Sequence, residues 1–119
     1  MKIEQYIEAN LGERLSVPEL CDRFSVSKFA LYRLFREEFQ TTVTEFILEK
    51  RIDLACQLLG EPQFQSITQV SEACGFADYN YFIRVFKARK GVTPLKYRQK
   101  LPGMKFTKKD PADAGRSLD

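Results

Sequence analysis

A chain of 119 residues has room for one small domain or two very small ones, but not for a multidomain enzyme. It is 44% hydrophobic, 13% aromatic and 29% charged, an ordinary globular composition that argues against wholesale disorder. Histidine is absent, which excludes Ser-His-Asp and Cys-His catalysis and every zinc site that needs imidazole. The three cysteines are far apart, so they fit neither a disulfide framework nor a Cys-x-x-Cys metal pair.

The net charge of +3 is unevenly distributed along the chain. In residues 1–27 five acids outnumber three bases, whereas residues 79–109 hold ten bases and no acid. This asymmetry favours a polyanionic partner, although a single run of charge is more often a solvated face. The sequence has no apolar stretch long enough to cross a bilayer and begins without a signal-peptide pattern, so we expect a cytoplasmic protein without a membrane partner.

Helical patterns fill the chain up to about residue 100, and strand signals are nearly absent. Apolar residues recur at helical spacing from Ile3 to Leu11, and Gly12 ends this first helix. Six further helices are predicted, most of them after a Ser, Thr or Asp that can cap a helix: 17–24, 28–39, 43–59, 67–74, 79–90 and 94–100. The predicted fold class is therefore all-α with seven helices.

The connections between these helices are short, which favours helix-turn-helix units over a bundle of long helices. We predict one folded domain over residues 1–101, with a first helix-turn-helix unit (1–41), a central linker helix (42–60) and a second unit (61–101). Residues 102–119 have few apolar side chains and no periodicity, so we predict a flexible tail there.

The two units resemble each other at a spacing of about fifty residues. In residues 31–36 and again in 82–87, an apolar residue is followed by any residue, an arginine, an apolar residue, a phenylalanine and a base. A capping box, a short helix and a turn precede each copy. The repeat indicates a protein with two helix-turn-helix motifs.

The second helix of each unit has an apolar stripe on one side and a base-rich stripe on the other. The base-rich stripes hold Phe29, Tyr32, Arg33 and Arg36 in the first unit, and Asn80, Ile83, Arg84 and Lys87 in the second. A DNA-reading helix needs this arrangement, because its inner side packs on the preceding helix while its outer side enters the major groove. There an arginine can donate two hydrogen bonds to guanine, and an asparagine can pair with adenine.

Each of these side chains has an ordinary alternative role on the surface. Arg33 could pair with Glu37 one turn later, but Arg84 has Ala88 at the matching position. The arginine recurs in phase in both units, so we favour DNA contact for both. For the aromatic residues near the helix starts, Phe29 and Tyr79, local packing and DNA contact stay equally open.

The central linker helix offers a geometric check. Nineteen residues, 42–60, span roughly 28 Å at a rise of ~1.5 Å per residue. Successive major-groove faces on one side of B-DNA are about 34 Å apart. A rigid helix of this length could hold two recognition helices in adjacent grooves, and a shortfall in distance would bend the DNA toward the protein. Its broad apolar face also fits a plain core helix.

The most specific signal is a motif in the second unit: residues 75–87 read GFADYNYFIRVFK, residues 91–94 read GVTP and residues 97–98 read YR. This motif closely resembles the C-terminal signature of AraC/XylS-family transcription regulators, and the similarity covers essentially residues 1–100. The resemblance implies a seven-helix DNA-binding domain with two helix-turn-helix units joined by a helix. It also implies bacterial promoter binding, most often as an activator that contacts RNA polymerase.

Carried over by position, the family's base-contacting residues are Phe29, Tyr32 and Arg33 in the first unit and Tyr79, Asn80, Ile83 and Arg84 in the second. The chain departs from the family pattern at Ser25 and Gln40, where glycine is usual, and Ser25 must bear any left-handed backbone strain in the first turn. It also departs at Cys21 and Ser71, where alanine is usual and a small side chain still permits close packing.

Other polar and cysteine side chains have simpler expected roles. Seven bases are candidate phosphate contacts: Lys28, Arg36, Lys87, Arg89, Lys90, Lys96 and Arg98. We expect Tyr97 to anchor the last helix by packing, and Cys21, Cys56 and Cys74 to lie in the core.

We therefore predict a domain that binds double-stranded promoter DNA as a monomer, needs no cofactor or metal and is not an enzyme. The alternative is a helix-turn-helix module that binds protein and not DNA, which predicts hydrophobic outer stripes and salt-insensitive binding. A stand-alone regulator and a domain of a longer regulator both stay open, as do the operator, the effector and the choice between activation and repression.

Overall fold

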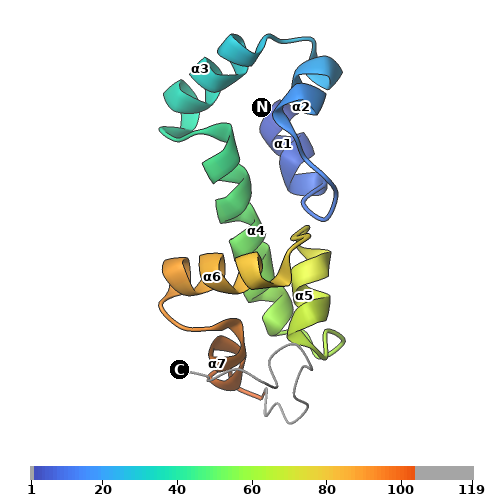
Figure 1. Cartoon of the computed structure of the whole chain (residues 1–119), viewed down its shortest axis with the longest axis vertical. Coiled ribbons are helices and arrows are strands. Elements are labelled where there is room, and N and C mark those ends of the chain that lie inside the picture. Colours follow the sequence, from blue (N-terminus) through green and yellow to red (C-terminus); the bar gives the residue numbers. More distant parts are fainter. Residues whose placement is uncertain (1, 104–119) are drawn as a thin grey trace. The chain divides into compact units, whose positions relative to one another are not determined.

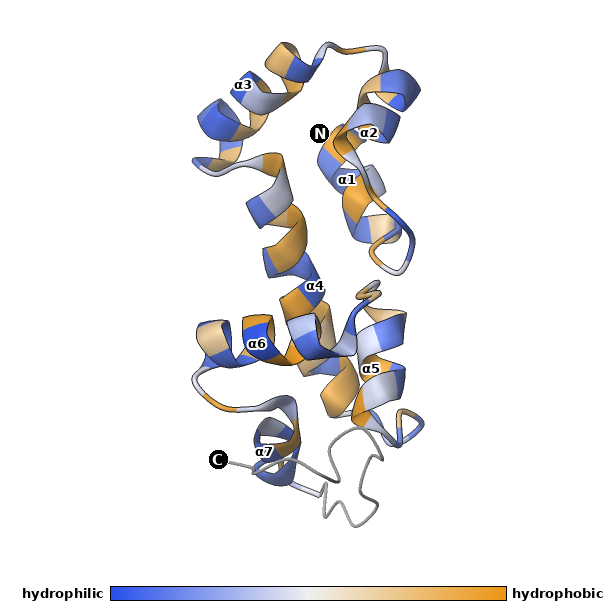
Figure 2. Ribbon diagram, viewed as in Figure 1, coloured by the Kyte–Doolittle hydropathy of each residue, from blue (hydrophilic) through white to orange (hydrophobic). Residues whose placement is uncertain are grey.

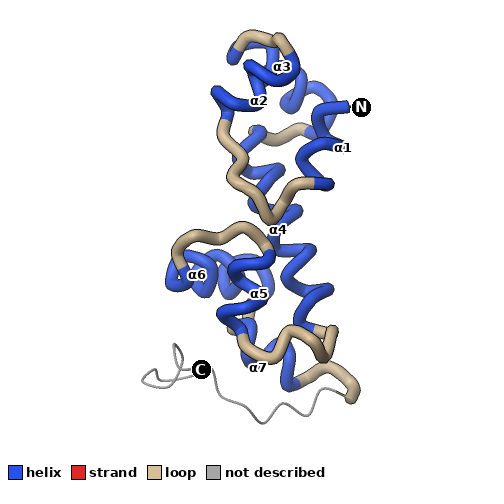
Figure 3. Tube along the Cα trace, turned by 90° about the vertical axis from the view of Figure 1, so that its right-hand side faces the viewer, coloured by secondary structure: helices blue, strands red, loops and turns tan. Residues whose placement is uncertain are grey.

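The computed structural model describes residues 2–103, and this range contains seven α-helices and no strand (Figures 1 and 3). The all-α prediction is therefore confirmed. The helices are α1 (Lys2–Ala9), α2 (Val17–Phe24), α3 (Lys28–Phe39), α4 (Val43–Leu59), α5 (Ile67–Ala73), α6 (Tyr79–Lys90) and α7 (Pro94–Gln99). None of the seven combines the length and the apolar content that a bilayer span requires. Of the predicted flexible tail, residues 104–119 lie outside the described range.

Side chains that cap helix N-termini set most of the helix boundaries. The hydroxyls of Ser16, Ser27 and Thr93 each accept a hydrogen bond from the backbone N–H three residues later, at 3.0–3.2 Å. Ser66 forms a full capping box with Gln69 at the start of α5. Three helices end earlier than predicted: α1 at Ala9, before the turn that contains Gly12, α5 at Ala73 and α7 at Gln99.

The chain divides into two compact units, and the division lies inside α4 between Arg51 and Ile52. The first unit comprises α1, α2, α3 and the first part of α4, and its core contains Ile7, Leu20, Leu31, Phe35 and Val43. The second unit comprises the rest of α4 with α5, α6 and α7, and its core contains Ile52, Leu59, Ile67, Phe82 and Phe86. Each unit thus has its own hydrophobic core and its own helix-turn-helix.

In the first unit, an aromatic cluster holds α3 against the start of α4. The rings of Phe35, Phe39 and Phe46 have centroids 4.9–5.3 Å apart, a distance at which aromatic rings attract. Arg51 on α4 also donates to the carbonyls of Leu11 and Glu13, at 3.1 and 2.8 Å. These contacts fix both α3 and the loop that precedes α2.

In the second unit, a row of aromatic contacts runs from the turn before α6 to α7. Phe82 lies 5.0 Å from Phe76 and 5.8 Å from Phe86, and Phe86 lies 5.5 Å from Tyr97 in an edge-to-face arrangement. Tyr97 thus anchors α7 by packing, as predicted. Its hydrogen bond with Cys56 raises the pKa of Tyr97, and burial adds to this effect.

The second unit also depends on a buried arginine. Arg98 on α7 has no exposed surface, and its guanidinium donates to the carbonyls of Leu59 at 2.9 Å, Gln65 at 3.2 Å and Phe64. Burial lowers the pKa of Arg98, because desolvation disfavours the charged form. The side chain joins α7 to the C-terminal end of α4 and to the loop before α5.

Two helices end on residues in the left-handed region that carry side chains. Ser25, after α2, has φ 55°, and Gln40, after α3, has φ 56°. These are the two positions where the family pattern has glycine, so the expected strain at Ser25 is present and Gln40 shares it. At the end of α6 the same conformation falls on Gly91, with φ 82°, where it costs little.

We predict that Ser25→Gly and Gln40→Gly each raise the free energy of unfolding by about 1 kcal/mol, because glycine removes the strain of a left-handed side-chain-bearing residue. Urea denaturation followed by circular dichroism measures the change. Gln40→Ala keeps the β-carbon and serves as the matched control, with no gain in stability. Glycine variants that are less stable than the parent would contradict this account.

We predict that Arg98→Met lowers the free energy of unfolding by about 3 kcal/mol or more, because the carbonyls of Leu59, Phe64 and Gln65 lose their buried donor. Lys100→Met, at an exposed position two residues later, should change it by less than about 0.5 kcal/mol. The same denaturation experiment compares the two variants. Equal stabilities would mean that the Arg98 hydrogen bonds do not hold the unit together.

Candidate nucleic-acid interface

Each unit presents one helix in the position of a recognition helix, the second helix of a helix-turn-helix. These are α3 in the first unit and α6 in the second, and a tight turn precedes each of them. In the first turn the Val26 N–H donates to the Cys21 carbonyl, and in the second the Phe76 N–H donates to the Ser71 carbonyl, both at 3.1 Å. The turns therefore have the same hydrogen-bond closure, although the second, residues 74–78, is two residues longer than the first, residues 25–27.

The two recognition helices have buried inner faces and exposed outer faces. Leu31 and Phe35 on α3, and Phe82 and Phe86 on α6, have no exposed surface. Arg33 and Arg84 are exposed at the matching positions. Polar and apolar colours alternate along both helices in Figure 2, as expected for helices that pack on one side only. The face assignment made from helical spacing therefore holds in both units.

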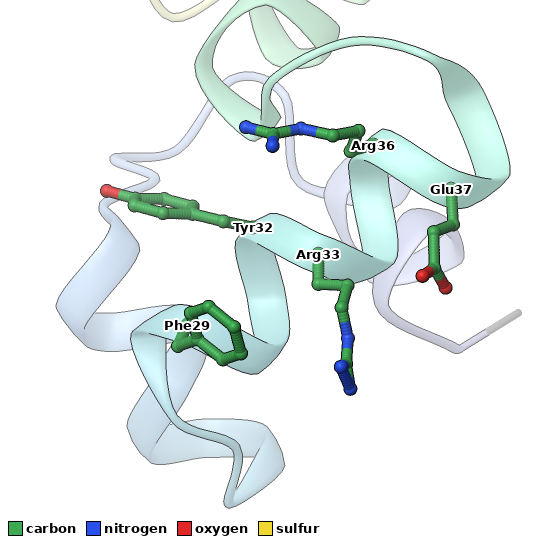
Figure 4. A pocket seen from close by; sticks show the side chains of 5 residues that line it. All are labelled: Phe29, Tyr32, Arg33, Arg36 and Glu37. Carbon is green, nitrogen blue, oxygen red and sulfur yellow. The ribbon is translucent and has the colours of Figure 1, made fainter.

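The outer face of α3 combines aromatic and basic side chains. Phe29 is 72% exposed and Tyr32 is 39% exposed. Together with Arg33, Arg36 and Glu37 they line a pocket of about 280 Å³ (Figure 4). Within this part of the described chain, the Arg33 guanidinium lies 5.5 Å from the centre of the Phe29 ring and makes no ion pair with Glu37. Phe29 is thus turned to solvent, and Arg33 lies beside its ring and is not paired with Glu37 in this structure, while the contact of Arg33 with DNA stays a prediction.

The outer face of α6 carries the second group of predicted base contacts. Asn80 and Arg84 are exposed, whereas Tyr79 and Ile83 are half-buried. Sequence reasoning missed Tyr81, which is 38% exposed and lies 5.6 Å from the Arg84 guanidinium. The signal that could have found it is the spacing: residues three apart are neighbours on a helix surface.

Most of the predicted phosphate contacts have accessible side chains. Five are exposed and Lys96 is half-buried; the exposed ones are Lys28, Arg36, Lys87, Arg89 and Lys90. The prediction for Arg98 is wrong, because its guanidinium is fully buried and donates to backbone carbonyls. A buried donor of this kind cannot reach a phosphate. In the sequence Arg98 stands in a run of basic residues, and nothing in that run indicates that its side chain is buried.

The cysteines only partly follow their prediction. Cys74 is buried, but Cys21 and Cys56 are half-buried, so the expectation that all three lie in the core is wrong for two of them. Cys56 lies against Tyr97, with which it forms a hydrogen bond. Residues 2–103 contain no group of three or more His, Cys, Asp or Glu side chains that could hold a metal ion.

Comparison with known proteins gives this architecture a family. A helix-turn-helix domain model matches residues 20–100. The chain is 41% identical over 96 residues to the transcriptional regulator CdhR of Pseudomonas aeruginosa. This match covers 81% of this chain and 28% of CdhR. It is also 35% identical over 95 residues to the transcriptional activator RhaR of Cronobacter sakazakii. That match covers 76% of this chain and 33% of RhaR. The chain thus spans about a third of the length of these relatives.

A solved structure agrees with the sequence relatives. A transcriptional regulator with an AraC-type DNA-binding domain from Chromobacterium violaceum superimposes with a TM-score of 0.74 and 33% identity, over 85% of this chain and 91% of that one. The matches define the class of this protein, a helix-turn-helix DNA-binding domain of transcription regulators. Within that class the chain belongs to the AraC/XylS family, as its motif predicts.

Proposed function

We propose that this domain binds double-stranded promoter DNA in a sequence-specific manner, with α3 and α6 in two adjacent major-groove segments. One observation carries the proposal: arginines at matched positions, Arg33 and Arg84, stand on the exposed faces of two helices whose opposite faces are fully buried. A recognition helix requires this division, since it must pack on its own unit and still offer hydrogen-bond donors to base edges.

In this proposal the side chains of the two outer faces have different tasks. Arg33 and Arg84 donate to guanine, and Asn80 pairs with adenine. The aromatic and aliphatic side chains, Phe29, Tyr32, Tyr79 and Ile83, contact thymine methyl groups or sugars. Phosphate contacts come from the accessible bases Lys28, Arg36, Lys87, Arg89, Lys90 and Lys96 and supply affinity without sequence preference.

We further propose that the domain binds as a monomer and activates transcription by contact with RNA polymerase. Two recognition helices in one chain can read two half-sites without a second copy. The similarity to RhaR, which is named as an activator, favours activation over repression. The functional organisation that we propose is two helix-turn-helix units, 1–41 and 61–101, joined through residues 42–60.

A protein-interaction module remains the competing function, because three aromatic side chains on the recognition helices are exposed: Phe29, Tyr32 and Tyr81. Each of these rings has a basic side chain within 6.0 Å, which suits a polyanionic duplex better than an apolar partner. The dependence of binding on salt separates the two functions, since counterion release accompanies phosphate contact.

We predict that selection from random duplex DNA enriches sites with two conserved segments about one helical turn apart, because each recognition helix reads its own major groove. Fluorescence anisotropy at several salt concentrations should then show affinity for the enriched duplex that falls steeply with salt. Failure to enrich any motif, or binding of a protein partner with no salt dependence, would favour the interaction module.

We predict that Arg33→Ala and Arg84→Ala each weaken binding to the enriched duplex by ~1–3 kcal/mol and relax the preference at one base pair. Lys90→Ala, at an exposed position in the last turn of α6, is the matched control. It should weaken all duplexes alike and reduce the salt slope by about 0.9, because it removes a single phosphate contact. Arginine variants with unchanged affinity and base preference would refute the assignment of the outer faces.

A further inference from the structure

We infer that Tyr81 is a positioning residue for Arg84: its ring directs the guanidinium and thereby sharpens the preference of α6 for guanine. This inference rests on the proposed function, in which Arg84 contacts a base. It adds to the interface a residue that is absent from the predicted set of base contacts.

The ring of Tyr81 contacts both a buried aromatic residue of the second unit and Arg84. It packs against Phe76, with ring centroids 6.1 Å apart, and Phe76 is itself only 6% exposed and lies 5.0 Å from Phe82. The Arg84 guanidinium carbon lies 5.6 Å from the centre of the same Tyr81 ring. Tyr81 therefore contacts a buried aromatic residue, Phe76, and also a cation, the Arg84 guanidinium.

The physical effect of this contact is to reduce the freedom of Arg84 before DNA arrives. An exposed arginine has several rotatable bonds, and part of its binding energy is lost in fixing them on association. A cation–π contact within about 6 Å of a ring centre favours conformers in which the guanidinium stays beside the ring. Because bidentate donation to guanine requires one orientation of the planar guanidinium, fewer free conformers mean tighter and more selective binding.

The first unit shows why the anchoring of the ring matters. There Arg33 lies 5.5 Å from the ring centre of Phe29, one turn earlier on α3. Phe29 is 72% exposed, against 38% for Tyr81, so its ring has less of the protein to restrain it. We therefore assign the stronger orienting effect to Tyr81, whose ring packs against the buried Phe76.

The test is a double-mutant cycle with matched variants of Tyr81. Tyr81→Leu keeps apolar packing against Phe76 and removes the ring face, whereas Tyr81→Phe keeps the ring and removes only the hydroxyl. Both are made in the parent chain and in Arg84→Ala. Binding is measured to the enriched duplex and to a duplex in which the base pair read by Arg84 is replaced, and thermal melting by circular dichroism verifies the fold of every variant.

We expect Tyr81→Leu to weaken binding to the enriched duplex about two- to five-fold, the effect of one exposed cation–π contact. The replaced duplex should be bound as by the parent chain, and Tyr81→Leu should have no further effect in the Arg84→Ala background. Tyr81→Phe should bind like the parent. If Tyr81→Leu does not fold, Tyr81→Met replaces it in the same cycle.

Equal losses from Tyr81→Leu with and without Arg84 would overturn the inference, because Tyr81 would then act on DNA by itself or through the stability of α6. A loss in Tyr81→Phe as large as in Tyr81→Leu would also overturn it and assign the effect to the hydroxyl. If Arg84→Ala binds every duplex like the parent, the proposed function of α6 fails, and the inference fails with it. The first two results leave the proposed function intact, so the two failures are distinguishable.

Discussion

In both units one arginine donates to backbone carbonyls that lie shortly before the helix-turn-helix in the chain. In the first unit Arg51 donates to Leu11 and Glu13, and in the second Arg98 donates to Leu59 and Gln65. Each arginine stands on the helix that follows the recognition helix. A guanidinium has five donors in a rigid plane, so one side chain can donate to several carbonyls at once. These hydrogen bonds hold the loop before α2 in the first unit and the loop before α5 in the second. They thereby help to position the first helix of each motif.

This constraint explains how so small a unit can present a rigid recognition helix. The helix after the recognition helix is tied to the preceding loop by hydrogen bonds and to the recognition helix by aromatic packing, as between Phe86 and Tyr97. The recognition helix is thus held in place by the segments that precede and follow it in the chain. Its outer face takes no part in these contacts. Side chains on that face can therefore change without loss of the contacts that hold the fold together.

The sequence predicts the helices well because their ends are marked by local chemistry. Ser27, Ser66 and Asp78 cap helices through hydrogen bonds within three residues, which a reader of the sequence can recognise. The buried and exposed faces of α3 and α6 follow equally from spacing, since helical periodicity alone decides which side chains share a face. The left-handed residues Ser25 and Gln40 could be anticipated only because a family pattern places glycine there.

The misread residues share a cause: their roles depend on contacts distant in sequence or on the direction of one side chain. Arg98 stands in a run of bases, but its acceptors lie more than thirty residues earlier, in a loop whose course no local pattern predicts. Tyr81 lies between the two faces of α6, so a division into inner and outer stripes assigns it to neither. Its partners, Phe76 and Arg84, are near in sequence, yet only their geometry shows that the ring joins a buried residue to an exposed cation. Charge and periodicity therefore predict which helices present basic side chains to a partner. The conformational freedom of each arginine depends on contacts between side chains, which only the structure shows.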